Sequence, residues 1–291
     1  MRLHLVDGTY ELYRAHFAPR PGHRDPSGKD AKATVGIVES MLALLHDAHE
    51  AVTHIAVAFD NPIRSFRNDL YLPYKSDEGV PPELRSQFDA AEDAVRAIGV
   101  TVWPMREYEA DDGLASGARG FRDRVEQVRI MSPDKDLGQC IQGDRVVQVD
   151  RRQKRVTNES AFRAERGFGP DSMADFLALA GDSADGFPGL PGFGKKTASM
   201  LIGAYERIER IPADSADWKV RPRGATQLAA TLVEHRDDAL LYRKLATLVD
   251  TVPIAESLDD LQFNGVPRAR FERWCDALGV QRLKTVPKRW Q

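Results

Sequence analysis

The stretch THIAVAFD, residues 53 to 60, is a run of mostly apolar residues that ends on a carboxylate, Asp60. Its length and its lack of polar alternation are typical of a strand that is buried on both faces. Working outward along the chain, further strand patterns occur at residues 3–6, 100–103, 127–132 and 145–150. The sequence therefore predicts a sheet with both faces covered.

Helical patterns separate these strands. Apolar residues recur at helical spacing over residues 35–45 and again over 84–98, a helix that Pro82 opens, and YEADDG (108–113) starts another. Strands that alternate with helices predict right-handed crossovers and a largely parallel sheet. From about Glu159 onward the strand patterns stop, and helical patterns follow at residues 171–180, 195–208, 225–249 and 268–278.

We therefore predict an α/β fold with a mostly parallel central sheet flanked by helices over residues 1–165, followed by a helical region over residues 166–291. Residues 20–32 and 80–83 are rich in Pro, Gly and charge and are predicted to be loops. At 291 residues, with 42% hydrophobic and 29% charged, the chain can bury a full core.

Composition excludes several classes of protein. No apolar run approaches the ~18 residues that a membrane span needs, so we expect no membrane partner and a cytoplasmic location. Cys140 and Cys275 lie far apart without metal-ligand spacing, which predicts two packing residues rather than a disulfide or a zinc site. The net charge of -3 argues at first against nucleic acid, but acids gathered around bound cations can leave a basic surface elsewhere.

Acidic residues follow four of the predicted strands. Asp7, Asp60, Asp134 and Asp136 come just after strands, and Glu109, Asp111 and Asp112 lie in YEADDG, shortly after another. A helix start explains YEADDG taken alone, but it explains the whole set only piecemeal. The carboxyl ends of parallel strands meet at one edge of a sheet, where so many carboxylates would repel unless cations neutralised them. Ligands that are all oxygens predict Mg2+ or Mn2+.

Two more acids, Asp182 and Asp185, lie in LAGDSADGFPGLPGFGKKTA, residues 179–198. They share a helix face if that segment is helical, and a helix C-terminus followed by a turn is an equally good interpretation. The glycines that follow fit a nucleotide-binding P-loop poorly, because position 196 is Lys and no strand precedes the loop. We predict instead a helix-hairpin-helix type of turn that grips a nucleic-acid backbone, and it comprises Gly189, Gly192, Gly194, Lys195 and Lys196.

A polar connection, FDNPIRSFRNDLYLPYKSDEGVPPE, spans residues 59–83. It interleaves the cations Arg64, Arg67 and Lys75 with aromatic rings. Such a segment can neutralise phosphates while its rings stack on unpaired bases. A solvated loop with buried aromatic side chains is the competing interpretation.

Five ordered motifs in the chain resemble the 5'-nuclease family. They are LVDGTYELYRAHFA (5–18), AVAFDNPIRSFRNDLYLPYK (56–75), YEADD (108–112), SPDKDLGQ (132–139) and GDSADGFPGLPGFGKKTA (181–198). The family includes the 5'-3' exonuclease domain of bacterial DNA polymerase I, phage 5'-exonucleases and flap endonucleases. The resemblance spans about residues 3 to 250. It implies an arch segment over about residues 62–85 and a hairpin DNA-binding motif over about 181–205.

The resemblance also implies roles for single residues. It implies that two or three divalent ions bind to Asp7, Asp60, Glu109, Asp111, Asp112, Asp134, Asp136, Asp182 and Asp185. It implies that Arg14 and Lys75 activate the scissile phosphate and contact DNA, with Asp7, Asp60 and Asp136 as the central catalytic acids. It implies strand contacts for Tyr13, Arg67, Tyr71 and Tyr74, and duplex binding, with a potassium ion, for the loop from Gly189 to Lys196.

Some positions depart from the family pattern. Glu78 stands where an Arg is usual, and Asp77 and Glu83 add further negative charge to the arch segment. Pro133 replaces a small residue before Asp134, and DGFPG (185–189) replaces DNIPG or DNLPG. The carboxylates themselves are all present.

These features predict a structure-specific 5' nuclease, a monomer that acts on DNA with a free 5' end, a flap or a nick. We expect metal-assisted hydrolysis that leaves 5'-phosphate and 3'-hydroxyl ends, with a role in replication and repair such as the removal of flaps or RNA primers. One alternative is a non-catalytic protein that binds branched DNA, although such a protein gains nothing from so many acids near phosphates. A second is an RNase with a related sheet.

Overall fold

The computed structural model describes residues 1–291, and the contacts within it divide the chain into two units. The first unit comprises Met1–Arg64, Asp77–Ser132 and Asp250–Gln291. The second unit comprises Ser65–Ser76 and Pro133–Val249, so a short segment of the predicted arch belongs to the second unit while both of its neighbours belong to the first.

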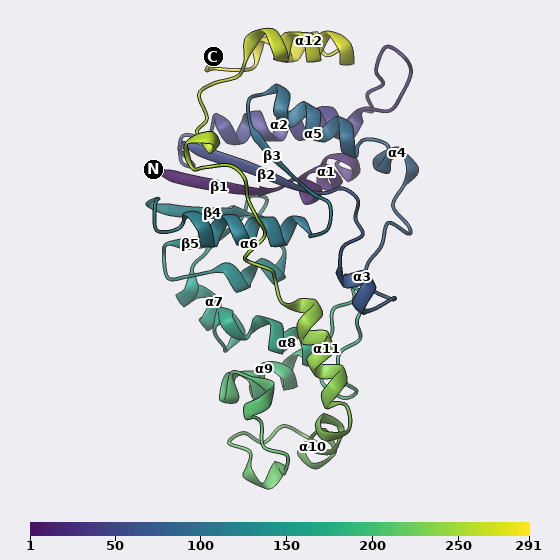
Figure 1. Ribbon diagram of the computed structural model, residues 1–291, viewed down its shortest axis with the longest axis vertical. Coiled ribbons are helices and arrows are strands. Elements are labelled where there is room, and N and C mark those ends of the chain that lie inside the picture. The colour runs from purple at the N-terminus through teal and green to yellow at the C-terminus, as the bar shows by residue number, and fades with distance from the viewer. The chain divides into compact units, whose positions relative to one another are not determined.

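Parallel strands form the centre of the first unit (Figure 1). They follow the order β3-β2-β1-β4, and their bounds are β1 Arg2–Asp7, β2 His54–Asp60, β3 Thr101–Met105 and β4 Gln127–Met131. Val6 lies beside Val57 on one side and Met131 on the other. Every residue of β2 is buried, which explains why THIAVAFD shows no polar alternation.

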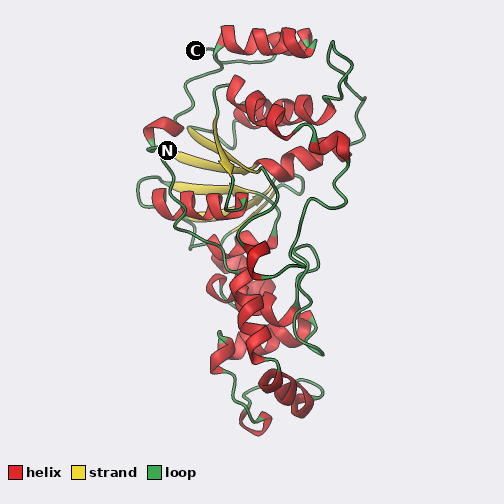
Figure 2. Cartoon of the chain, turned by 45° about the vertical axis from the view of Figure 1, so that its right-hand side comes forward, coloured by secondary structure: helices red, strands yellow, loops and turns green.

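Helices cover both faces of these strands (Figures 1 and 2). α6 packs across all four strands, while α1 packs against β2, and α2 and α5 continue that layer. α12 packs against α5. The helices of this unit are α1 Gly8–Phe17, α2 Lys32–Leu45, α4 Pro82–Arg85, α5 Phe88–Ala97, α6 Ala110–Phe121 and α12 Arg268–Leu278.

The second unit is mainly helical. Its helices are α3 Arg67–Leu70, α7 Glu159–Arg166, α8 Met173–Ala180, α9 Lys195–Tyr205, α10 Ala225–Glu234 and α11 Arg236–Ala246. α8 packs against α9 and α11, and their apolar faces form the core of the unit. The unit also holds an antiparallel pair of strands, β5 (Val146–Asp150) and β6 (Arg155–Thr157).

The predicted fold class is confirmed, because strand pairings are mostly parallel, helices flank them, and helices dominate the second half of the chain. The prediction missed α1, whose first turn is capped by the Asp7 carboxylate, and it missed β6. The helix expected from Pro82 is broken into α4 and α5. Its break lies beside Gln87, whose side-chain amide donates to the carbonyl of Glu83 and to Asp30.

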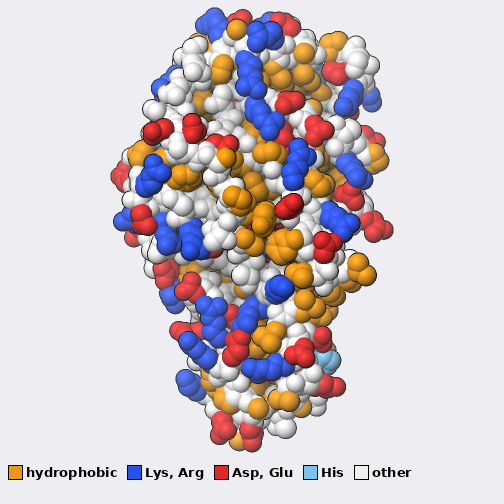
Figure 3. All heavy atoms as spheres, in the orientation of Figure 1, with side chains coloured by type: hydrophobic (Ala, Val, Ile, Leu, Met, Phe, Trp, Pro, Cys, Tyr) orange, Lys and Arg blue, Asp and Glu red, His pale blue; other side chains and the backbone are white.

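Other differences are local. The helical pattern over residues 225–249 forms two helices, α10 and α11, that meet at His235. Of the loop expected over residues 80–83, the last two residues belong to α4, which begins at Pro82. Cys140 and Cys275 form no disulfide. Cationic and anionic side chains are interspersed over the face drawn in Figure 3, in keeping with a net charge near zero. None of the helices combines the length and the apolar character that a membrane span requires.

Candidate active site

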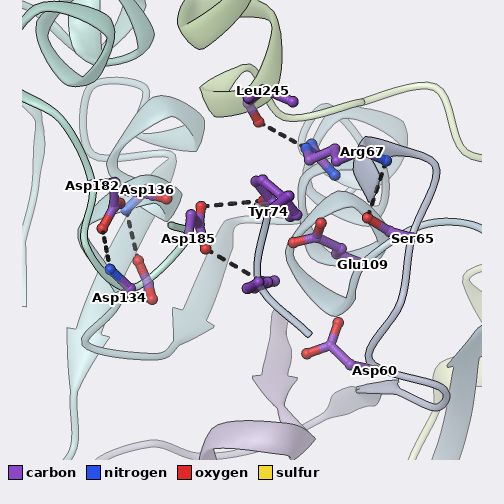
Figure 4. Close-up of polar contacts among 12 residues, drawn as sticks. Asp60, Ser65, Arg67, Tyr74, Glu109, Asp134, Asp136, Asp182, Asp185 and Leu245 are labelled. Carbon is purple, nitrogen blue, oxygen red and sulfur yellow. Dashed lines mark hydrogen bonds and ion pairs between the residues drawn. The ribbon is translucent and has the colours of Figure 1, made fainter. Parts of the chain in front are cut away.

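Asp136, Asp182 and Asp185 form a buried acidic trio in the second unit (Figure 4). One carboxylate oxygen from each lies within 4.8 Å of the others. Asp136 lies in a short 3-10 helix, Lys135–Cys140, that follows the strand-end sequence SPD. The structure therefore brings together three acids that the sequence places in two separate motifs.

A tight turn, and not a helix, places Asp182 and Asp185. α8 ends at Ala180, and the backbone N-H and C=O of Asp182 pair with Phe187 at 2.8 and 3.0 Å. The Asp182 carboxylate accepts a hydrogen bond from the N-H of Ala184, which fixes the turn. The segment is not helical, so the condition for a shared helix face is not met, and the alternative interpretation as a helix end followed by a turn is confirmed.

The electrostatics of the trio reflect its burial. Burial raises the pKa of Asp136 well above its usual range, the nearby charges of Asp134, Asp185 and Asp182 raise it further, and only Lys135 opposes them. The Lys135 ammonium donates to Asp182 at 2.5 Å and lies 3.4 Å from Asp136. Although burial alone would lower it, the pKa of Lys135 is raised by these acids. One cation thus offsets part of the repulsion among three anions.

The Oδ1 atom of Asp136 is buried and accepts no hydrogen bond. The Lys135 ammonium forms an ion pair with this oxygen at 3.4 Å, but one ammonium offsets the charge of three buried carboxylates only in part, so a further cation would stabilise them. Oxygen ligands of this kind suit a hard divalent ion such as Mg2+ or Mn2+. The trio therefore fits a divalent metal site.

Asp134 shapes the backbone beside the trio. Its carboxylate accepts the N-H of Asp136 at 2.9 Å and so caps the short helix that carries Asp136 (Figure 4). Its backbone carbonyl accepts a hydrogen bond from the Gln148 side chain. Asp134 is exposed, and its predicted role as a metal ligand stays a prediction.

Lys75 and Tyr74 reach the trio from the segment Ser65–Ser76. The Tyr74 hydroxyl donates to Oδ2 of Asp185 at 3.2 Å (Figure 4). The Lys75 ammonium lies 3.6 Å from Oδ1 of the same carboxylate. The backbone N-H of Lys75 also donates to the Asp185 carbonyl at 3.0 Å. The residue expected to activate a phosphate is thus held beside an expected metal ligand.

The remaining acids belong to the first unit. Asp7 and Asp60 end neighbouring parallel strands, as the sequence predicts, since Asp7 lies beside Ala58 in the register. The Asp7 carboxylate accepts from Tyr10 N-H at 2.8 Å and from the Ser132 hydroxyl at 2.9 Å. The roles of these acids as metal ligands stay predictions.

The YEADDG segment serves as a helix start. Asp60 accepts the N-H of Ala110 at 2.7 Å, and Glu109 and Asp112 form a reciprocal capping box at the first turn of α6. Glu109 and Asp112 are buried, whereas Asp111 is half-buried. The helix-start interpretation is therefore correct for this stretch, and it is compatible with metal binding because carboxylates have further lone pairs to offer.

The predicted DNA contacts differ in exposure. Arg14 donates to the Ser40 hydroxyl and pairs with Glu11, and the half-buried ring of Tyr13 contacts Phe88 edge-on. In the second unit, Tyr71 packs edge-on against Tyr242, and Tyr74 is buried. Arg67 is only 1% exposed, and the sequence does not foresee its burial.

The glycine loop leads into α9 as expected. Gly189 and Gly192 have φ angles of 71° and 83°, and Gly194 is the N-cap of α9 without a side-chain cap. Lys195 and Lys196 are exposed in the first turn, beside backbone N-H groups that no side chain of the cap satisfies. The loop before α9 follows the helix α8, whereas a P-loop follows a strand, so the structure agrees with the rejection of a P-loop. Contact with phosphate stays a prediction.

Two residues of the site were not singled out from the sequence. Lys135 lies between Asp134 and Asp136 in PDKD (133–136), and this alternation of charge is the only feature of the sequence that indicates its role beside the acids. Asn68 donates from its side-chain amide to the carbonyls of Tyr74 and Lys75, and nothing in the sequence marks it.

Comparisons with known proteins identify the family of the chain. Two family models match the chain: "5'-3' exonuclease, N-terminal resolvase-like domain" over residues 2–167 and "5'-3' exonuclease, C-terminal SAM fold" over residues 168–269. A 5'-3' exonuclease of Bacillus subtilis is 32% identical over 99% of this chain and 95% of that protein. DNA polymerase I of Bacillus caldotenax is 33% identical over 96% of this chain.

This chain spans about a third, 32%, of that polymerase. Among solved structures, the flap endonuclease of bacteriophage T5 in a complex with DNA and metal ions has a similar fold, with a TM-score of 0.63 at 17% identity over 86% of this chain and 89% of that chain. The family models together cover most of the sequence, and the Bacillus subtilis relative matches it nearly end to end. The chain therefore belongs to the 5'-3' exonuclease family.

Proposed function

We propose that the chain is a structure-specific 5' nuclease, both a 5'-3' exonuclease and a flap endonuclease, that hydrolyses DNA next to a free 5' end, a flap or a nick. The observation that carries the proposal is the buried trio of Asp136, Asp182 and Asp185 with the Lys75 ammonium 3.6 Å from Asp185. A binding protein would have no use for three buried carboxylates whose charge a single lysine, Lys135, offsets only in part.

The trio would hold the divalent ion. When bound, Mg2+ or Mn2+ supplies Lewis-acid stabilisation of the phosphate and makes an attacking water more acidic. Asp7, Asp60, Glu109, Asp111, Asp112 and Asp134 are the proposed ligands for a full set of two or three ions.

The residues of the chain have separate tasks in this proposal. Lys75 places positive charge where the phosphate gains negative charge in the transition state, and Arg14 is proposed to do the same. Asp185 orients Lys75 through its backbone carbonyl and its carboxylate. Lys135 keeps Asp136 and Asp182 close together despite their like charges. In-line displacement leaves 5'-phosphate and 3'-hydroxyl ends.

Recognition of DNA is proposed to be structural. The loop from Gly189 to Lys196, with its free backbone N-H groups and exposed lysines, would bind one duplex backbone, with K+ as an additional ion. Tyr13 and Tyr71 would guide a single strand near the arch segment, whereas the buried Tyr74, whose hydroxyl donates to Asp185, would support that segment from within. The division into a nuclease core over residues 1–165 and a helical DNA-binding region over residues 166–291, and a cytoplasmic, monomeric role in replication and repair, belong to the same proposal.

A single experiment tests the proposal. The full chain is titrated with Mg2+ and Mn2+ against a 5'-labelled flap, a nicked duplex and a blunt duplex, with a chelator as the blank. We expect metal-dependent cleavage of the flap and the nick and slower attack on the blunt duplex. Binding to the flap without any cleavage in either metal would identify a branched-DNA-binding protein instead. A matched RNA flap that is cut faster than the DNA flap would identify an RNase.

A further inference from the structure

Arg67 lies in the segment Ser65–Ser76, which carries Tyr74 and Lys75 and belongs to the second unit although the residues on both sides belong to the first. We propose that Arg67 is a positioning residue, which holds Lys75 beside Asp185 by anchoring this segment to the C-terminal end of α11. The inference rests on the proposed function, since it assigns a task to Arg67 in the use of Lys75.

The Arg67 side chain donates hydrogen bonds to backbone carbonyls at the C-terminal end of α11. Its Nε donates to the carbonyl of Leu245 at 2.8 Å (Figure 4). Its Nη2 donates to the carbonyl of Thr247 at 2.9 Å. α11 ends at Ala246, so these carbonyls belong to the helix end that lacks intrahelical donors and carries partial negative charge. A planar guanidinium with several fixed donors can satisfy two such acceptors at once, whereas an ammonium cannot match that geometry.

The side chain of Asn68 links the start of the segment, at Ser65, to Tyr74 and Lys75 at its end. Its carbonyl oxygen accepts from the N-H of Ser65 at 2.9 Å, and its amide donates to the carbonyls of Tyr74 and Lys75 at 3.3 and 2.9 Å. The short helix α3, which begins at Arg67, is followed by turns that bring Tyr74 back over the segment. Arg67, Asn68 and Lys75 therefore belong to one hydrogen-bonded fold of the backbone.

α11 also supports the turn that carries the acids. The Tyr242 ring, which α11 carries, contacts the Tyr71 ring edge-on and stacks on the Phe187 ring, with 5.9 and 5.7 Å between the ring centroids. Phe187 is the residue whose backbone pairs with Asp182. One helix thus contacts both the segment of Lys75 and the turn of Asp182 and Asp185, and it fixes their spacing.

The fit between segment and turn is close. Gly186, directly after Asp185, has a φ of 84°, and a Cβ there would lie 2.3 Å from the carbonyl oxygen of Pro73. The backbone of the turn can approach the segment only because this residue has no side chain. A loss of the anchor at Arg67 would relax this approach and move the Lys75 ammonium away from the acids.

This placement separates two roles for Arg67. Arg67 is 1% exposed, and its guanidinium donates to two carbonyls of the second unit. A positioning residue should change the rate of the chemical step, whereas a phosphate contact should change the affinity for DNA. The two roles therefore predict different kinetic effects.

The test compares Arg67→Ala, Arg67→Lys, Lys75→Ala and the double variant Arg67→Ala with Lys75→Ala. Single-turnover cleavage of a flap is measured at saturating enzyme, and flap affinity is measured in Ca2+. We expect Arg67→Ala to slow cleavage between about tenfold and a hundredfold with less than about a twofold change in affinity, because a small misplacement of a catalytic group has effects of this size. Arg67→Lys should not restore the rate, and the double variant should be no slower than Lys75→Ala.

Weaker flap binding at an unchanged rate, or a double variant that multiplies the two single effects, would overturn the proposal. If Arg67→Ala does not fold, Asn68→Ala tests the same path, and a folded Asn68→Ala with the full cleavage rate would refute it. Amide hydrogen exchange over residues 71–76 gives a readout that needs no activity, and it should be faster in Arg67→Ala. Absence of cleavage by the unaltered chain would refute the proposed function alone, and unchanged exchange would refute the anchoring alone.

Discussion

Lys75 and Asp185 are joined twice, once through their side chains and once through their backbones. The ammonium lies 3.6 Å from the carboxylate, and the N-H of Lys75 donates to the Asp185 carbonyl at 3.0 Å. Tyr74 adds a third link through its hydroxyl. The acid and the cation therefore hold a fixed relative position before any ligand binds, which reduces the reorganisation needed during the reaction.

Lys75→Ala should lower the rate of flap cleavage by about 100- to 1000-fold, the usual effect of removing one group that stabilises a transition-state charge. Flap affinity should change little, because duplex binding is proposed to reside in the glycine loop. Single-turnover kinetics and binding in Ca2+ measure the two effects. Lys284→Ala is the matched control, since Lys284 pairs with Asp276 on α12 and not with a site residue. Equal rates for the two variants would show that Lys75 takes no part in the chemistry.

Asp136→Asn should nearly abolish cleavage and, in the presence of a chelator, should raise the melting temperature. The reason is charge: the carboxylate of Asp136 is buried among other acids, and burial raises its pKa, so its ionised form destabilises the metal-free protein. An increase of about 1 kcal/mol in the free energy of unfolding corresponds to a rise of about 2 to 4 °C in melting temperature for a domain of this size.

Differential scanning fluorimetry with and without Mn2+ checks this expectation. The unaltered protein should be stabilised by Mn2+, and Asp136→Asn should lose most of that stabilisation. Asp171→Asn, a change at an exposed acid outside the trio, should keep it. A Mn2+ effect of the same size in both variants would remove Asp136 from the metal site.

The strand-end acids could be predicted because periodicity and topology determine them. A buried strand has no polar alternation, and the carboxyl ends of parallel strands share one edge, so Asp7 and Asp60 could be placed from the sequence alone. The position of Asp136 after β4 follows from the same pattern.

Other parts of the site depend on tertiary contacts that no short pattern encodes. Arg67 looks like a solvated cation in the sequence, and its burial requires the carbonyls of Leu245 and Thr247, which lie about 180 residues away. The turn after α8 likewise depends on the pairing of Asp182 with Phe187, which competes with helix propensity. The burial of Arg67 and the turn after α8 therefore depend on contacts with distant residues or across the turn, which local sequence propensity does not predict.

Lys195→Ala combined with Lys196→Ala should weaken duplex binding and lower the slope of log affinity against log salt by about 1 to 2, since each phosphate contact contributes about one released counterion. Both lysines are exposed at the start of α9. Binding titrations between low and high salt measure the slope. Lys29→Ala combined with Lys288→Ala removes the same charge from exposed positions elsewhere. Identical slopes for the two double variants would show that the loop does not touch phosphate.

A buried polar cluster in the first unit should make the stability of the protein sensitive to acid. Glu50 accepts hydrogen bonds from Arg129 at 2.7 and 3.0 Å and lies 3.0 Å from the ring of His4, a fully buried residue of β1. Burial alone would raise the pKa of Glu50, but His4 and Arg129 lower it to about 2. Burial lowers the pKa of His4 despite the nearby carboxylate.

Both pKa shifts predict a loss of stability on acidification, because the unfolded chain binds more protons than the folded one. The contribution of Glu50, at most about 3 kcal/mol, is present above its ordinary pKa of 4.5 and is lost as the pH falls toward 2. Glu50→Gln should therefore lower the free energy of unfolding at pH 7 and flatten its fall between pH 4.5 and 3, measured by urea unfolding. Glu107→Gln, at an exposed site, should leave both unchanged. Parallel pH profiles for Glu50→Gln and the unaltered protein would contradict the prediction, since they would mean that Glu50 is no more acidic in the folded state than in the unfolded one.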